Sequence, residues 1–404
     1  MNIIRRQTYI DRIEHLIGKE TIIVLTGQRR VGKSYLLKTI AEMKAKLTDS
    51  NIIYIDKEKS TFDFIKTYED LNAYIQNAYR PDLHNYIFID EVQEIKEFER
   101  SVRNWRTEPN TDLIITGSNA EIMSSTLSTM IGGRYTEVYV QSLSYLEFLD
   151  FYALQDSDDS LRKYIDYGGL PGLIKLGIEH PEDIFGYQMN VFNTVLLKDV
   201  IMRHEIRNAP FLMNLVKFIA DNVGKQISAG SIGKYMRSQE QSVTIPLILN
   251  YLSYLCDAYI IARADRYDIH GKKLFDSNAK YYFEDHGLRN ALVGGRRDSD
   301  IEKVIENVIY RQLIYLGYDV KVGQLQVGEV DFVCAKPGAS PLYIQASFIV
   351  ADEQTRLREF GRLKEIQDNY PKYVISMTPL VDRTDEDGII HLSLRRFLTK
   401  GFAD

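Results

Sequence analysis

The residues of this sequence that are best suited to chemistry form a glycine-rich loop, GQRRVGKS, from Gly27 to Ser34. An apolar run of strand length precedes the loop, and the periodic pattern YLLKTIAEM after it predicts a helix. In such a loop, backbone N–H groups and the helix N-terminus bind phosphate oxygens, and the lysine contacts the β- and γ-phosphates. Lys33 is therefore the predicted phosphate contact, and Ser34 the predicted ligand of Mg²⁺. The residues predicted to bind the nucleotide are Gly27, Gln28, Arg29, Arg30, Val31, Gly32, Lys33, Ser34 and Tyr35.

Two adjacent carboxylates follow another apolar run, YIFIDE, and end it at Asp90 and Glu91. An aspartate at the carboxyl end of a strand can hold magnesium beside a phosphate loop, and the next carboxylate can orient the attacking water. We predict that Asp90 lies on the magnesium side and that Glu91 is the base that activates water.

Polar residues also follow the predicted strand in DLIITGSN. Ser118 or Asn119 is expected to lie between the water and the γ-phosphate, with Thr116 as a less favoured substitute. Serine and asparagine are also ordinary turn residues, so a structural role stays open.

One arginine, Arg134, stands just before a further alternating strand in GGRYTEVYV. An arginine in this place could reach the nucleotide of a neighbouring subunit and stabilise transition-state charge, which would require a homo-oligomer. A surface arginine beside a Gly-Gly turn is an equal alternative.

These candidates must be positioned by strands near residues 21–27, 51–56, 85–91, 112–118 and 135–142, which alternate with helical stretches. The alternation predicts an α/β fold, with a mostly parallel sheet, helices on both faces and the nucleotide at the carboxyl ends of the strands. The first predicted domain spans residues 1–145.

The ordered motifs resemble those of the prokaryotic AAA-type ATP-binding proteins that carry a C-terminal domain of unknown function. The motifs are TGQRRVGKS, FIDEVQ, ITGSN, GGRY followed by LSYLEFL, YGGLPG, LLKDV and KYYFEDHGLRNAL. The resemblance implies ATP binding and hydrolysis with Mg²⁺. It supports Lys33, Ser34, Asp90 and Glu91 in their roles, whereas Arg203 is only a guess for a second sensor.

The middle of the chain is predicted to be helical. Residues 146–208 read as a packed lid over the nucleotide, interrupted by YGGLPG. Residues 209–290 read as three helices and a hairpin that turns at His270-Gly271, the outline of a winged helix-turn-helix. Its cations, Lys234, Arg266, Lys272 and Lys273, suit DNA, but a role in packing or subunit contact is equally open.

Residues 300–404 show the order helix, three strands, helix, strand, and this α/β order resembles the PD-(D/E)xK (restriction-endonuclease-like) nuclease core. Active members place an acid on the first helix, an aspartate on the second strand and Glu-x-Lys on the third. Glu306 and Asp331 match, whereas Gln345 and Ser347 replace the last pair. A neutral amide offsets the charge of a dication poorly, so we expect a scaffold without nuclease activity. Lys336 or Arg356 could fill the place of the missing lysine.

The composition of the 404 residues excludes several classes of protein. The net charge of −6 gives no general attraction to nucleic acid, and the two cysteines, Cys256 and Cys334, have neither disulfide nor metal-ligand spacing. No apolar run is long enough to span a bilayer, and the charged start does not look like a signal peptide, so we expect a cytoplasmic protein without membrane contact.

Three hypotheses follow. The leading one is an AAA-type ATPase, acting as a homo-oligomer, that couples its nucleotide state to the winged-helix and nuclease-like modules, with DNA as a candidate partner. The second is a nucleotide-controlled binding switch or regulator with slow turnover. The third and least favoured is an ATP-dependent DNA nuclease.

Overall fold

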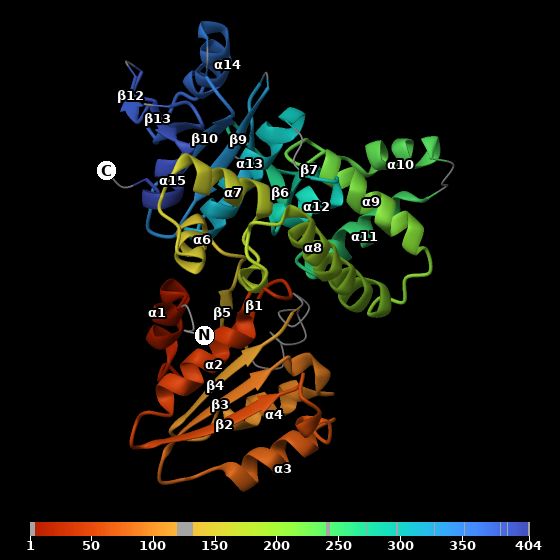
Figure 1. The fold of residues 1–404 in the computed structure, drawn as a ribbon, viewed down its shortest axis with the longest axis vertical. Helices are drawn as coiled ribbons and strands as arrows, with labels where there is room; N and C mark the ends of the chain where they lie inside the picture. Colours follow the sequence, from red (N-terminus) through yellow and green to blue (C-terminus); the bar gives the residue numbers. More distant parts are fainter. Residues whose placement is uncertain are drawn as a thin grey trace. The chain divides into compact units, whose positions relative to one another are not determined.

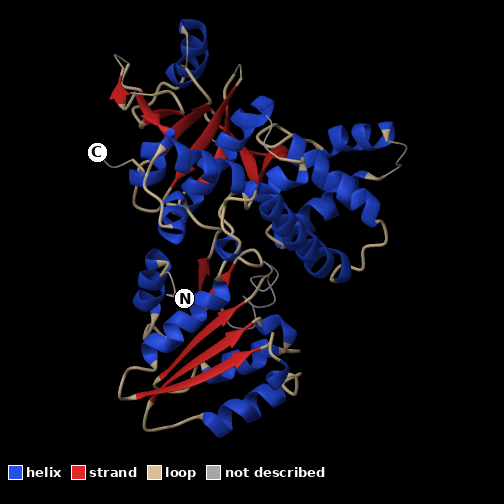
Figure 2. Ribbon diagram, in the orientation of Figure 1, coloured by secondary structure: helices blue, strands red, loops and turns tan. Residues whose placement is uncertain are grey.

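The chain forms two compact units, described here from a computed structural model (Figures 1 and 2). The first unit comprises Met1–Gln141 with Asp257–Tyr259, and the second comprises Ser142–Cys256 with Ile260–Asp404. The structure describes residues 5–118, 132–239, 243–271, 273–295, 298–326, 328–350, 352–379, 381–385 and 387–402, without the side chains of 275–277.

A five-stranded parallel sheet forms the centre of the first unit, in the order β2-β3-β4-β1-β5. This confirms the predicted parallel α/β fold. Because all the strands run in one direction, the residues that follow their carboxyl ends meet at one edge of the sheet. The strands are β1 (Ile22–Thr26), β2 (Ser50–Asp56), β3 (His84–Asp90), β4 (Thr111–Thr116) and β5 (Tyr135–Tyr139).

Helices cover both faces of this sheet, as the apolar strands require. Helices α3 (Tyr68–Ala78) and α4 (Phe98–Trp105) pack on one face over alternate strand residues such as Ile87 and Ile89. Helix α2 (Lys33–Lys44) packs on β2, β3 and β4, and α1 (Gln7–Leu16) on α2 and β5. All five residues of β1 are buried, which is typical of a parallel strand covered on both sides.

The second unit begins with helices that surround a short central helix, α12 (His286–Leu292). Helices α7, α8 and α9 all contact α12. The residues predicted to form a lid, 146–208, therefore pack into the second unit. The helices are α6 (Tyr145–Tyr152), α7 (Asp158–Tyr167), α8 (Pro181–Val195) with a π-helical continuation (Leu196–Met202), α9 (Ala209–Asp221), α10 (Ala229–Ser238) and α11 (Ile245–Asp257).

Two sequence motifs of the second unit, YGGLPG and EDHGL, form one interlocked contact. The backbone N–H of Gly169 donates to Asp285 Oδ2 at 2.8 Å, and the N–H of Leu288 donates to Asp285 Oδ1 at 3.0 Å. A Cβ on Gly168 would lie 2.5 Å from Asp285, and one on Gly287 would lie 2.1 Å from the carbonyl oxygen of Tyr167. The glycines are therefore needed because two backbones approach too closely for side chains.

The neighbouring histidine belongs to the same packing contact. His286 is buried, and its Nε2 lies 2.7 Å from the carbonyl oxygen of Tyr164. Burial lowers the pKa of His286, which favours the neutral imidazole. Asn290 donates to the carbonyl oxygen of Ile165 at 3.0 Å. These residues join α12 to the end of α7.

An eight-stranded mixed sheet runs through the rest of the second unit, in the order β12-β13-β11-β10-β9-β8-β6-β7. Strands β6 (Ile261–Asp268) and β7 (Lys273–Phe283) form the predicted hairpin, and Ile227 pairs with Ala279 of β7. The sequence suggested that residues 209–290 and 300–404 were separate modules. Parallel pairing of β6 with β8 (Asp319–Gln324) instead places both in one sheet, which satisfies backbone groups that a free edge would expose.

The last hundred residues show the predicted order of helix, three strands, helix and strand. The carboxyl-terminal elements then complete the sheet through parallel pairing of β11 with β13. The elements are α13 (Ile301–Tyr315), β8, β9 (Glu329–Ala335), β10 (Leu342–Ser347), α14 (Glu353–Lys364), β11 (Lys372–Ser376), β12 (Arg383–Thr384), β13 (Ile390–Ser393) and α15 (Leu394–Lys400).

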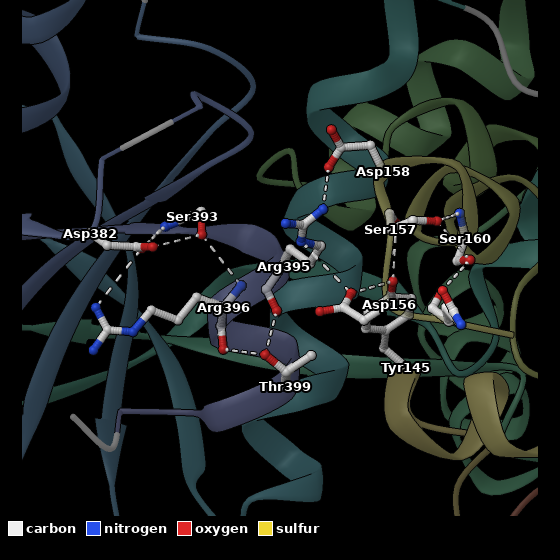
Figure 3. Close-up of polar contacts among 11 residues, drawn as sticks. Tyr145, Asp156, Ser157, Asp158, Ser160, Asp382, Ser393, Arg395, Arg396 and Thr399 are labelled. Atoms are coloured by element: carbon white, nitrogen blue, oxygen red, sulfur yellow. Dashed lines mark hydrogen bonds and ion pairs between the residues drawn. The ribbon is translucent and has the colours of Figure 1, made fainter.

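Ion pairs connect α15 with the first residue of α7 and the segment before it (Figure 3). Arg395 Nη1 lies 2.7 Å from Asp158 Oδ1, and Arg395 Nε lies 3.7 Å from Asp156 Oδ1, which also accepts from the Tyr145 hydroxyl at 2.9 Å. The Asp158 side chain is 93% exposed, so solvent screens this contact and it contributes little stability.

Candidate functional site

The phosphate loop connects the end of β1 to the start of α2. Gly27 has φ +129°, and a Cβ there would lie 2.1 Å from the carbonyl oxygen of Val140. Gly32 precedes α2 with φ 103°. Both glycines thus adopt backbone angles that other residues rarely adopt, and the loop curls back over the first turn of the helix.

The polar groups inside this loop are arranged around a buried lysine. Lys33 is 4% exposed, and its Nζ donates to the carbonyl oxygens of Gly27 at 2.7 Å and Gln28 at 2.9 Å. Gln28 is 2% exposed, and neither of its side-chain amide atoms has a hydrogen-bond partner among the described residues. A buried polar group without a partner is costly, so the loop fits a ligand that supplies polar atoms.

The remaining predicted loop residues differ in exposure. Val31 is buried and Tyr35 is 59% exposed. Arg30 is exposed with φ 70°, whereas Arg29 lies 3.9 Å from both Glu58 and Glu91. Of the two arginines, only Arg29 is therefore directed toward the predicted catalytic acid.

Arg6, for which no sequence motif indicated a role, hydrogen-bonds to the phosphate loop from outside the loop. Arg6 is 4% exposed and stands before α1. Its Nη1 donates to the carbonyl oxygen of Val31 at 2.9 Å and to that of Gln141 at 2.8 Å, and its guanidinium lies 4.5 Å from the ring centre of Tyr9. Arg6 thereby links the phosphate loop to the end of the segment that follows β5.

Replacing Arg6 with methionine should weaken binding of Mg·ATP about 5- to 30-fold, because two charge-assisted hydrogen bonds that hold the loop are lost. Calorimetric titration measures the dissociation constant. The neighbouring exposed Arg5 provides the matched control, and Arg5→Met should leave it unchanged. Equal affinities for all three proteins would contradict a positioning role for Arg6.

The two predicted acids meet at the carboxyl edge of the sheet, where β3 and β4 lie side by side. Asp90 is 1% exposed, and its Oδ1 accepts from the Thr116 hydroxyl at 2.5 Å. The same hydroxyl accepts from the backbone N–H of Glu91 at 2.9 Å. Burial raises the pKa of Asp90, and hydrogen bonds from Thr116 and Ser34 oppose this effect. Asp90 and Ser34 are therefore adjacent, as the donor set for Mg²⁺ requires.

Glu91 is held in an unusual conformation beside these residues. Its φ is 54°, in the left-handed region, and the residue is 6% exposed. Burial tends to raise the pKa of Glu91, but the charges of Lys33 and Arg29, with smaller contributions from hydrogen bonds, outweigh it and the pKa is lowered. Glu91 is thus an ionised carboxylate in a buried position. Backbone strain of this kind concentrates at functional sites.

One of the two residues that the sequence favoured as the polar sensor, Ser118, lies beside Glu91. Gln93 Nε2 donates to Glu91 Oε2 and lies 3.5 Å from Ser118 Oγ, and Ser118 is fully buried. Asn119 lies outside the described residues. Thr116, the less favoured alternative, is the residue that contacts both acids, because the register of β4 places it opposite the end of β3.

Arg134 lies at the opposite edge of the sheet from the phosphate loop. Its carbonyl oxygen accepts from the N–H of Ile22, the first residue of β1, and the loop begins after Thr26, the last. At roughly 3.3 Å per residue, β1 separates the two by ~16 Å. The exposed Arg134 is therefore too far to contact a nucleotide on the loop of its own chain.

The guess for a second sensor, Arg203, belongs to the second unit and follows its π-helical segment. Its Nη2 lies 4.0 Å from Oδ1 of the buried Asp199. Of the cations predicted to suit DNA, Lys234 and Lys273 are exposed, whereas Arg266 donates to Gln324 within the sheet. Lys272 lies outside the described residues.

In the second unit, the two acids predicted from the nuclease-like pattern are brought together by a lysine. Lys280 Nζ lies 2.9 Å from Glu306 Oε1 and 3.1 Å from Asp331 Oδ1. Gln345 is 2% exposed, its Oε1 has no hydrogen-bond partner in the part of the chain that the structure describes, and Ser347 is buried. The proposed substitutes lie elsewhere: Lys336 donates to the Leu316 carbonyl oxygen, and Arg356 pairs with Asp385. No sequence motif indicated a role for Lys280, because it lies in a different predicted module from the two acids.

The sheet order, the phosphate loop after β1 and the acid pair after β3 define the first unit as an AAA-type P-loop ATPase domain. Residues 19–149 match the family described as AAA domain, and residues 158–299 match a domain of unknown function, DUF8612. In the described part of the chain no helix is both long and apolar enough to cross a membrane.

The whole chain belongs to the family of an uncharacterized protein of Haemophilus influenzae, to which it is 30% identical over 393 residues, 96% of each chain. It is 25% identical over 332 residues to an uncharacterized protein of Methanocaldococcus jannaschii, covering 79% of this chain and 72% of that one. Among solved structures, a Walker-type ATPase of Pyrococcus abyssi is similar with a TM-score of 0.51 at 15% identity. That similarity covers 72% of this chain and 96% of the other, and it shows the fold alone.

Proposed function

We propose that this protein binds ATP with Mg²⁺ in the phosphate loop and hydrolyses it, with Glu91 as the base that activates water. The observation that carries the proposal is the position of Glu91, which is buried 3.9 Å from Arg29 and whose backbone N–H donates to the same Thr116 hydroxyl that contacts Asp90. An ionised carboxylate can accept a proton from water. Because its position is fixed, the carboxylate is already oriented for this reaction.

The roles of the other residues follow from their charges. Lys33 would exchange the loop carbonyl oxygens it now contacts for phosphate oxygens, and Ser34 and Asp90 would hold Mg²⁺. When bound, Mg²⁺ would offset the charge of the β- and γ-phosphates. Gln93 would keep the Glu91 carboxylate in place, and Thr116 would fix the spacing between the two acids.

The proposal is tested with Lys33→Ala. Loss of the ammonium should weaken Mg·ATP binding by at least about 100-fold and abolish measurable hydrolysis, because a buried charge-assisted contact to phosphate is removed. Lys38→Ala is the matched control: Lys38 lies on the same helix, is 62% exposed and pairs with Glu42. Calorimetry and phosphate release measure the two effects. Tight ATP binding by Lys33→Ala would sink the assignment.

We propose in addition that the protein acts as a homo-oligomer in which Arg134 contacts the nucleotide of a neighbouring subunit. Its exposure and its distance from its own phosphate loop support this role over one within the same chain. In light scattering, the wild-type mass should increase with ATP, and a monomeric mass with bound nucleotide would contradict the proposal.

The coupling of ATP hydrolysis to the second unit is tested by measuring the rate of hydrolysis with and without double-stranded DNA.

A further inference from the structure

The strongest unexplained feature outside the nucleotide site is a carboxylate cluster around Lys280, formed by Glu306, Glu329 and Asp331. Lys280 lies on β7 and its side chain is 1% exposed. Its Nζ lies 2.9 Å from Glu306 Oε1, 2.9 Å from Glu329 Oε1 and 3.1 Å from Asp331 Oδ1. An ammonium has three N–H donors, so these carboxylates provide one acceptor for each of them.

The local backbone brings these acids to one point. Glu329 and Asp331 are two positions apart on β9, and alternate residues of a strand point to the same face, so both can reach the lysine. A bulge against β8 follows at Asp331 and Phe332. Glu306 approaches from α13.

Other protein groups also contact the three carboxylates of the cluster. The Tyr282 hydroxyl also donates to Glu306 Oε1 at 2.7 Å. The backbone N–H of Ala346 donates to Asp331 Oδ2 at 2.9 Å, and Gln226 donates to Glu329 Oε2 at 2.6 Å. A Cβ on Gly224 would lie 2.6 Å from Glu306 Oε2, so backbone packs directly against that side. The ammonium therefore lies at the centre of the cluster, and the sides of the carboxylates that face away from it are hydrogen-bonded or packed against the protein.

Charge balance explains why a cation must stand there. Without Lys280, up to three negative charges would share a site from which water is largely excluded, which is very unfavourable. Even with the lysine, burial and the nearby Asp331 raise the pKa of Glu306 to about 7, while Lys280 opposes the shift. One cation is thus required, and the internal ammonium supplies it.

A divalent metal does not fit the same place while the lysine is present. The ammonium occupies the point that the three carboxylate oxygens share, and Gln345 offers a neutral amide instead of another acid. Within the described residues, no group of three or more histidine, cysteine, aspartate or glutamate side chains is arranged to hold a metal ion. The nuclease-like part of the chain therefore lacks the arrangement of acids around a metal that metal-dependent chemistry requires.

We propose that Lys280 is the permanent cation of this cluster, that it excludes divalent metal from the wild-type protein, and that its removal creates a latent metal site. The cluster then acts as a joint that ties β7 of the hairpin to α13 and β9 of the last hundred residues, in keeping with the shared eight-stranded sheet. This inference is independent of the proposed ATPase activity.

The test titrates Mn²⁺ into the full chain without nucleotide and follows binding by calorimetry and by the electron paramagnetic resonance of free Mn²⁺. Wild type should show no Mn²⁺ site that depends on Asp331, so wild type and Asp331→Asn should behave alike. Lys280→Ala should gain one site per chain, at least ~10-fold tighter than any wild-type binding, and the added change Glu306→Gln should remove it. Lys321→Ala, which deletes a lysine paired with Asp319 on β8, should gain none.

Two results would overturn the proposal. The first is Mn²⁺ binding by wild type that Asp331→Asn abolishes, because the cluster would then hold metal in the presence of the lysine. The second is a folded Lys280→Ala protein, judged by circular dichroism, that gains no site. If Lys280→Ala does not fold, Lys280→Met can replace it, because methionine keeps the apolar stem of the side chain. The comparison of Mn²⁺ binding by wild type and Asp331→Asn does not depend on either variant and still tests whether the wild-type cluster excludes metal.

Discussion

Glu91→Gln should lower the steady-state rate of ATP hydrolysis by about 10²- to 10⁴-fold while the dissociation constant for Mg·ATP changes by less than about threefold. Glutamine keeps the size of the side chain and can still contact Gln93, but its amide does not accept a proton from water. Glu91 is ionised in a buried position because Lys33 and Arg29 offset the effect of burial on its pKa. The expected loss is therefore in turnover and not in binding.

A matched control for this experiment lies three residues away. Glu94 is exposed and belongs to the same short helical segment, Val92–Glu94, so Glu94→Gln should hydrolyse ATP at the wild-type rate. Phosphate release under saturating ATP measures turnover, and calorimetry measures affinity. Unchanged hydrolysis by Glu91→Gln would show that another group activates water.

Gly287→Ala should destabilise the second unit by about 3 kcal/mol or more. The added methyl would stand 2.1 Å from the carbonyl oxygen of Tyr167 and 2.4 Å from Gln188 Nε2. The first of these is backbone, which cannot turn away as a flexible side chain can, so α7 and α12 must separate. The network of Asp285, which bonds to Gly169 and Leu288, would be strained by the same movement.

A change from glycine to alanine elsewhere in the unit should have the opposite effect on its stability. Gly186 is exposed on α8, and a Cβ there meets nothing within 4 Å, so Gly186→Ala should stabilise the unit by about 0.5–1 kcal/mol through helix propensity. Hydrogen exchange of peptides from α7 and α12 reports these changes, because the single tryptophan, Trp105, reports on the first unit. Equal exchange in the two variants would refute the interlock.

Local patterns predicted the elements of the first unit well. Four of the five parallel strands contain a short apolar run and β5 alternates, and the phosphate loop combines glycines, a lysine and a serine at a fixed spacing. The end of an apolar run likewise identified Asp90 and Glu91 as neighbours of that loop. The choice among Thr116, Ser118 and Asn119 stays a prediction, because it depends on the register between β3 and β4 and Asn119 lies outside the described residues.

Residues a few positions apart were therefore enough to predict the chemistry of the loop, the acids after β3 and the order of helices and strands. The distant residues that complete each site could be identified only in the folded chain. Arg6 reaches Gln141 across 135 positions, and Lys280 reaches Asp331 across 51. The pairing of β6 with β8 also required the folded chain. The physical reason is that a charged side chain is buried only where distant segments together supply its partners. No local sequence pattern predicts which distant segments come into contact.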